Sequence, residues 1–174
     1  MSHLNATPQR PLLVVLTSVM LCLSSLLCGC SNSKLVDGYR PDETAQLTLM
    51  LRQVIDKLKA EDFIGLYRAY AGSRFQQHLP ERTFLRRAQC VDKTFGQLQA
   101  APSVLPAFTR SEHPTLGVTD HVTIGLNYTY GPLKVDIIVV PYGDTFKFWD
   151  FTWKTKYPQT PQARALTQCL AKVG

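Results

Sequence analysis

The hydrophobic pattern of this chain changes from a helical to a strand period at Gly96, and this change limits the fold more than any other feature. Before Gly96, apolar residues recur at steps of three and four, which is the spacing of one face of an α-helix. After Gly96 they alternate with polar residues, as in β-strands that bury one face. Helices followed by strands are typical of an α+β fold, with the helices packed on one side of an antiparallel sheet.

Three helices are predicted ahead of the change of period, and a fourth closes the chain. The first covers residues 42–59, the second begins near residue 61 or 62 and ends by 72, and the third covers 80–96. Residues with capping or helix-stopping chemistry stand at these ends, namely Asp42, Gly72 and Gly96. A short helical pattern also follows Thr160.

The strands are predicted at 118–130, 133–140 and 145–157, with a less regular one at 95–108. Turn residues separate them, so neighbouring strands form hairpins. We therefore expect a curved antiparallel sheet of three to four strands. Wrapped over the helices, such a sheet leaves a cone that opens at one end.

The last strand carries the densest aromatic run, with five Phe or Trp among the eight residues 146–153. Phe148 stands on one parity, while Trp149, Phe151 and Trp153 stand on the other, which predicts a bulge or strong bend at Phe148-Trp149. Trp149, Phe151 and Trp153 are candidate binding residues, because exposed aromatics commonly anchor interfaces. The alternative is that both faces of a bent strand are buried.

The N-terminal segment has the pattern of a targeting signal. Arg10 is followed by an uncharged run over residues 11–29. The run ends in Leu27-Cys28-Gly29-Cys30, which resembles a bacterial lipobox. This resemblance implies a signal peptide over 1–29, a lipid on Cys30, a tether over 30–41 and one domain over 42–174. The alternative is an uncleaved signal anchor. Both interpretations place the domain outside the cytoplasm.

Lipidation would account for the odd number of cysteines, which is five. Cys22 and Cys28 leave with the signal peptide and Cys30 is modified, so Cys90 and Cys169 remain. An even pair in an oxidising compartment predicts a disulfide. For a loop of this length the chain-entropy model gives a stabilisation of roughly 4.5 kcal/mol. The alternative is two buried thiols that act as small hydrophobic side chains.

The order of elements resembles the nuclear transport factor two-like, or cystatin-like, superfamily over residues 42–157. The matching features are the helix pair 47–58 and 63–70, the Phe95-Gly96 exit and the strand meander 118–157. The superfamily includes enzymes such as ketosteroid isomerase, with catalytic groups inside the cone, and many non-catalytic binding modules. Dimerisation through the open sheet face is common in it. The resemblance therefore does not choose a function.

Asp150 is the carboxylate best suited to acid–base chemistry. It stands between two aromatic residues, and an apolar setting raises the pKa of a carboxyl group. Tyr67 and Tyr128 are the candidate hydrogen-bond donors, with Tyr70 and Tyr130 as further tyrosines. The alternatives are a surface position for Asp150 and core packing for the tyrosines.

No metal or cofactor site is expected. His78, His113 and His121 are widely scattered, and neither a CxxC nor a closely spaced His pair is present. His121 follows Asp120, but adjacent strand residues point to opposite faces, so the two do not form a pair. Motifs for nucleotide binding, serine hydrolases and zinc proteases are also missing.

The charge balance is basic, with a net charge of +6. Without Arg10, 18 Lys and Arg of the original 19 stand against 13 Asp and Glu, which leaves +5. Such a domain suits anionic lipid headgroups, and outside the cytoplasm we expect no nucleic-acid partner. Arg82, Arg86 and Arg87 share one helical face. This face either contacts anionic groups or only keeps the domain soluble.

We therefore expect a lipid-anchored binding or scaffolding module of a bacterial envelope, without catalysis. Ser31 after the lipidated Cys30 differs from the Asp that often retains such proteins in the inner membrane, so the outer membrane facing the periplasm is expected. The partner would be an envelope protein, a second copy, or a small apolar ligand in the cone. The alternatives are an isomerase or dehydratase using Asp150 and a tyrosine, and a purely structural lipoprotein.

Overall fold

The structure is a computed structural model that describes residues 39–173; the predicted signal peptide, Cys30 and most of the tether lie outside the described residues. Its helices are α2 (Pro41–Lys59), α3 (Phe63–Tyr70), α4 (Ser73–His78), α5 (Glu81–Phe95) and α6 (Pro161–Ala171). Its strands are β1 (Leu98–Ala100), β2 (Thr109–His113), β3 (Gly117–Tyr128), β4 (Gly131–Tyr142) and β5 (Thr145–Thr155). The α+β order predicted from the change of period is confirmed.

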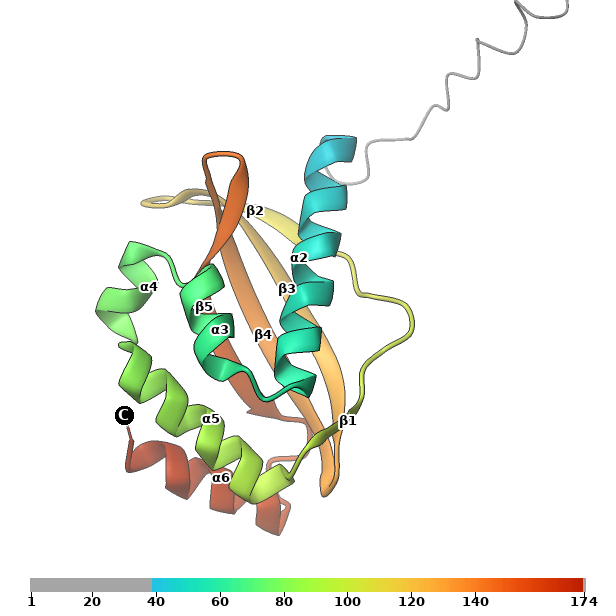
Figure 1. The fold of residues 1–174 in the computed structure, drawn as a ribbon, viewed down its shortest axis with the longest axis vertical. Coiled ribbons are helices and arrows are strands. Elements are labelled where there is room, and N and C mark those ends of the chain that lie inside the picture. The colour runs from blue at the N-terminus through green and yellow to red at the C-terminus, as the bar shows by residue number, and fades with distance from the viewer. Residues whose placement is uncertain (1–38, 174) are drawn as a thin grey trace, which may run out of the picture. The chain divides into compact units, whose positions relative to one another are not determined.

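The sheet is antiparallel, with the strand order β1-β3-β4-β5. The short strands β1 and β2 both pair with β3, near its end and its beginning respectively. Helices α2 and α3 lie across one face of this sheet, with α5 beside them (Figure 1). No helix among the described residues is both long and apolar enough to cross a membrane.

Two details of the predicted secondary structure are wrong. The sheet has five strands instead of three to four, because residues 95–108 form only the short β1 and then a loop, and β2 follows. Pro102 and Pro106 lack the N–H that a ladder needs. The sequence of β2, Thr-Arg-Ser-Glu-His, has no apolar alternation, so periodicity could not find it. The short helix α4 was also missed, within the segment after Gly72.

The bulge predicted in the last strand is confirmed. Ile138 pairs with Asp150 and Val139 pairs with Phe148, so Trp149 has no partner across the ladder. Because of this extra residue, Phe148 and Phe151 both point to the helix side of the sheet, and both are buried.

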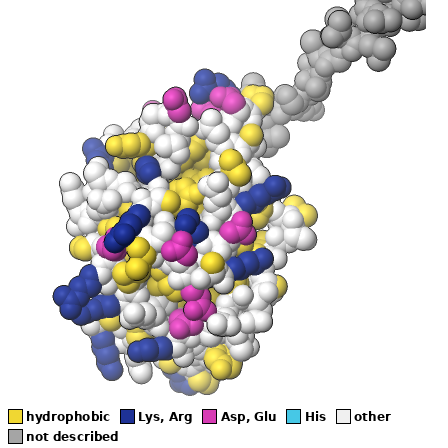
Figure 2. Space-filling view, viewed as in Figure 1, with side chains coloured by type: hydrophobic (Ala, Val, Ile, Leu, Met, Phe, Trp, Pro, Cys, Tyr) yellow, Lys and Arg dark blue, Asp and Glu magenta, His cyan; other side chains and the backbone are white. Residues whose placement is uncertain are grey.

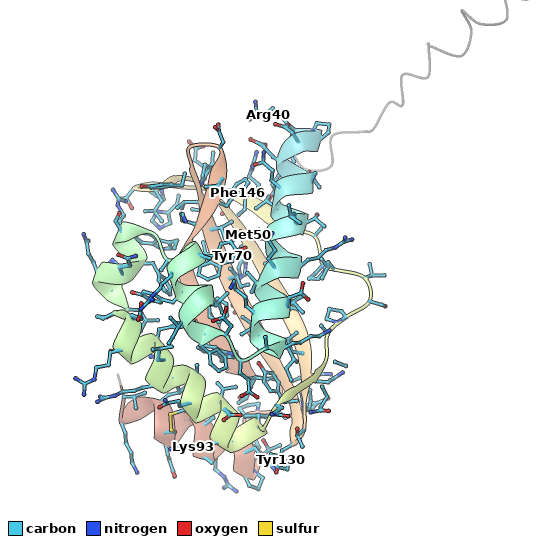
Figure 3. All side chains as sticks on the ribbon, viewed as in Figure 1. Arg40, Met50, Tyr70, Lys93, Tyr130 and Phe146 are labelled. Carbon is cyan, nitrogen blue, oxygen red and sulfur yellow. A yellow bond between two sulfur atoms is a disulfide. The ribbon has the colours of Figure 1, made fainter. Side chains whose placement is uncertain are left out.

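The space between helices and sheet is filled with side chains. Phe84 from α5 packs against Tyr67 and Phe75 on neighbouring helices and against Phe151 and Trp153 on β5. Met50, Tyr70 and Phe146 belong to the same core and are labelled in Figure 3. The predicted cone is therefore a packed core at this position, and a ligand site must be sought elsewhere on the domain.

Cys90 and Cys169 form a disulfide, with their Cα atoms 5.7 Å apart. The bond joins α5 to α6 and is drawn in yellow near Lys93 in Figure 3. Leu166 of α6 is buried in the same core. The disulfide thus ties the end of the chain to the central helix layer, as the cysteine count predicted.

Candidate functional site

A groove of about 440 Å³ lies between α2 and the loop that joins β1 to β2. We call it the α2 groove. Leu47 and Leu51 of α2 and Phe108 of the loop line it and are all buried, and Leu105 adds a half-buried apolar wall. Its volume lies within the range of small-molecule sites, and such sites are mostly apolar with a few polar groups.

The groove follows from the sequence of its two walls. Leu47 and Leu51 stand one helical turn apart, so they form a stripe on the same face of α2 as Thr48. Pro102 and Pro106 keep the facing loop out of the sheet, and this loop runs beside α2 in Figure 1. The loop therefore stands off from the helix as a separate wall.

Tyr39 lines the groove and also belongs to a group of polar residues that we call the buried ion cluster: Tyr39, Glu43, Arg110 and Asp120. Arg110 donates from Nε to Asp120 Oδ1 (3.0 Å) and from a terminal nitrogen to Glu43 Oε2 (3.0 Å). The Tyr39 hydroxyl donates to Asp120 Oδ1 at 2.6 Å. The Arg110 guanidinium also lies over the Tyr39 ring, 4.0 Å from its centre.

The electrostatics of this cluster move the pKa values of Tyr39, Arg110 and Glu43 away from neutral pH. Burial, and then the bond to Asp120, raise the pKa of Tyr39 well above its usual value. The hydrogen bond to Asp120 raises the pKa of Arg110 despite partial burial. The backbone N–H of Arg40, and then Arg110, lower the pKa of Glu43. Such fixed charges suit a structural clamp better than proton transfer.

The cluster places the start of α2 against β2 and β3. Asp120 is fully buried while its neighbour His121 is exposed, as the alternation of strand residues predicts. Tyr39 lines the groove as well as bonding Asp120, so it is part of the packed domain.

Asp150 is half-buried on the sheet face that points away from the helices. Its Oδ1 accepts from the backbone N–H of Phe151 (2.8 Å) and from the hydroxyl of Thr152 (3.2 Å). Tyr67 and Tyr128 contact the core on the opposite, helix side of the sheet. The sheet thus separates Asp150 from both candidate donors.

Both tyrosines are engaged in packing. The Tyr67 hydroxyl donates to the backbone oxygen of Leu79 at 2.9 Å, and burial raises its pKa. Tyr128 packs edge-on against Phe95, and burial raises its pKa to about 12. Tyr70 donates to the side chain of Gln53, whereas Tyr130 is exposed.

The three candidate binding aromatics occupy different environments. Phe151 and Trp153 are 1% and 5% exposed, so their rings contact the core and not solvent. Trp149, the bulged residue, lies beside the ring of His78 and beneath the guanidinium of Arg74. It lines a second, smaller cavity of about 270 Å³ next to α4.

The remaining chemical candidates are metal ligation and the cysteines. Within residues 39–173, no group of three His, Cys, Asp or Glu could hold a metal ion. Cys90 is bonded to Cys169 and is not a free thiol. Cys30, the predicted lipidation site, lies outside the described part of the chain.

The basic residues of α5 form part of a charged edge. Lys and Arg side chains gather along the side of the molecule formed by α4 and α5 (Figure 2). Arg82 and Arg86 are exposed there, while Arg87 is half-buried. The helical face predicted from their spacing thus divides into two exposed cations and one that packs against the protein.

Comparison with protein-family models, with curated proteins and with solved structures finds no match for this chain. Its function must therefore be argued from the groove and the groups around it.

Sequence reasoning missed both the groove and the buried ion cluster. The cluster joins residues separated by 67 positions (Glu43 and Arg110) and by 81 positions (Tyr39 and Asp120). One signal of the cluster was available in the sequence. Asp120 occupies the same alternating positions of its strand as the buried Val122 and Ile124, so its side chain is expected to point inward. A carboxylate on a buried face needs a cation, and Arg110 on the adjacent strand supplies it.

Proposed function

We propose that this chain is a lipid-anchored binding module of the bacterial cell envelope, held at the periplasmic face of the outer membrane, with the α2 groove as its ligand site. The observation that carries the binding role is the groove itself, an apolar hollow of about 440 Å³. The disulfide between Cys90 and Cys169 supports an oxidising compartment. The lipobox-like end of the N-terminal segment supports the anchor.

The arrangement of Asp150 and the tyrosines favours binding over catalysis. A general base must come within hydrogen-bond reach of its substrate, and the donor must reach the same substrate. Here the sheet stands between them. The open sheet face also carries polar pairs, such as Asp136 with Lys154 and Thr123, which favours exposure to solvent over an apolar dimer interface.

A structural lipoprotein without a ligand is the second candidate. It is favoured by the filled interior, because the space expected to be a hollow cone contains Phe84, Phe148 and Phe151. The two functions differ in whether the α2 groove takes up a small apolar molecule.

The groove is tested by photolabelling of the full chain held in nanodiscs of phosphatidylcholine. The probe is a dodecanol that carries a diazirine, and labelled peptides are mapped by mass spectrometry. We expect labelling of α2 and of the loop 101–108. Thr48→Trp should fill part of the groove, so that roughly two methylenes of the probe are no longer buried in it. This loss lowers the affinity for the probe, and with it the labelling, about tenfold.

Leu49→Trp is the matched control, because Leu49 is exposed on the same helix and does not line the groove. It should leave labelling unchanged, and both variants should retain the circular dichroism of the parent. Equal labelling in Thr48→Trp and in the parent, or no labelling of the groove peptides at all, would leave the structural function as the better account.

The anchor is tested by the intact mass of the chain purified from membranes of its host. We expect the mass of residues 30–174 plus a triacyl group, and a gain of two hydrogens on reduction of the Cys90–Cys169 bond. The mass of the whole uncleaved chain would instead identify residues 11–29 as a membrane anchor. In that case the lipidation of Cys30 and the outer-membrane position would both be wrong.

A further inference from the structure

Arg52 is the one charged side chain among the described residues that line the α2 groove. It lies on α2 one residue after Leu51, and it is exposed. It forms no ion pair with any described residue, including Asp56 one turn further along the helix. A cation without an ion-pair partner in the described part of the chain therefore stands at the edge of an apolar hollow.

Two other cations, Arg110 on β2 and Arg40 at the start of α2, differ from Arg52 in this respect. Arg110 is bound by Asp120 and Glu43 within the buried ion cluster, and Arg40 pairs with Glu43. Their charges are matched by the protein itself. Arg52 is thus the cation that remains available to a ligand at this position.

The other polar groups of the groove are largely turned to the protein. The hydroxyl of Thr48 donates to the backbone oxygen of Thr44, and that of Thr44 lies 3.4 Å from the backbone oxygen of Arg40. Ser103 on the facing loop makes no side-chain hydrogen bond to another described residue. Arg52 and Ser103 therefore supply the side-chain donors for a polar head, one from each wall.

The geometry points to a free single-chain amphiphile with an anionic head, such as a fatty acid, as the ligand of the α2 groove; this inference rests on the proposed binding function. The chain lies on Leu47, Leu51 and Phe108, and the carboxylate lies at Arg52. A guanidinium binds a carboxylate through two parallel N–H donors, which suits this head group. A groove of about 440 Å³ is at the small end for ligand sites, which favours one chain over two.

The inference is tested with three photoreactive probes that share one dodecyl chain and differ in the head: a carboxylate, an alcohol and a trimethylammonium. The full chain in phosphatidylcholine nanodiscs is labelled with each. We expect the carboxylate to label α2 and the loop 101–108 about two- to fivefold more than the alcohol, as for one exposed ion pair, and the trimethylammonium to label least.

Arg52→Gln should remove the preference for the carboxylate while leaving labelling by the alcohol unchanged, and Arg52→Lys should restore part of it. Arg86→Gln is the control, because Arg86 is an exposed cation on α5 that does not line the groove. It should keep the full preference.

The possible failures are distinguishable. Equal labelling by carboxylate and alcohol, or a preference that survives Arg52→Gln, overturns the anionic head but leaves a groove that binds apolar chains. Absence of groove labelling by every probe overturns the proposed function together with this inference. Phosphatidylglycerol in the disc and free dodecanoate are also compared as competitors of groove labelling. If phosphatidylglycerol suppresses the labelling as strongly as dodecanoate does, the ligand is a two-chain membrane lipid and the free amphiphile is overturned.

Discussion

Asp120 shows how one residue can link distant parts of this domain. It is fully buried, and its carboxylate accepts from Tyr39 and Arg110. Through these two bonds it joins Tyr39, two residues before α2, to Arg110 on β2. A buried carboxylate is tolerated because its charge is matched, and removing one member of such a set leaves an uncompensated charge.

We expect Asp120→Ala to lower the free energy of unfolding by about 3 kcal/mol, at the low end for a broken buried pair because Arg110 keeps Glu43 as a partner. Urea denaturation followed by tryptophan fluorescence measures this change. Asp56→Ala, at an exposed site that forms no ion pair with a described residue, should change stability by less than about 0.5 kcal/mol. Equal effects of the two substitutions would mean that the buried ion cluster does not stabilise the fold.

At the scale of elements, the hydrophobic period predicted the long helices and strands that bury one face. The long helices α2 and α5 and the strands β3 to β5 bury one face each, so their apolar residues repeat at a fixed step. The bulge in β5 was also visible, because Phe148 and Phe151 both face the core and this requires one unpaired residue between them.

The short elements α4 and β2 gave no such signal. Helix α4 buries only Phe75. All five residues of β2 are polar, and none of them is buried. Strand β2 exists because its backbone pairs with β3 and because Arg110 reaches Asp120 across that pair. Pairing with a distant strand is a tertiary effect, and a window of sequence around β2 does not contain it.

At the scale of the whole molecule, stability should depend on pH at both extremes. The pKa of Glu43 is lowered by the Arg40 backbone and by Arg110, and that of Asp62 by Lys57 and by the Gly65 backbone. For Asp136, burial raises the pKa but the bonds from Lys154 and Thr123 lower it more. The unfolded chain therefore binds more protons in acid than the folded chain.

We expect stability to be complete above about pH 4.5, the ordinary value for Glu, and to fall as pH drops through the lowered pKa values. In alkali the sign reverses, because burial raises the pKa of Tyr128 from 10.0 to about 12. Its contribution is present below about pH 10 and is lost as pH rises towards 12.

Urea midpoints measured from pH 3 to pH 11 test both the acid and the alkaline loss of stability. Glu43→Gln should flatten the acid limb, and stability that rises on acidification would contradict the assignment.

The amino-acid sequence by itself determined the α+β order, the bulge and the Cys90–Cys169 pair, because each depends on a period, a parity or a count that can be read along the chain. The tertiary structure alone decided where a ligand could bind. The predicted cone is closed because Phe84 of α5 meets Phe148 and Phe151 of β5 inside it. The α2 groove opens instead where a proline-containing loop stands beside a helix more than forty residues away in the chain. Contacts between segments so far apart depend on how the elements pack, and no local pattern records them.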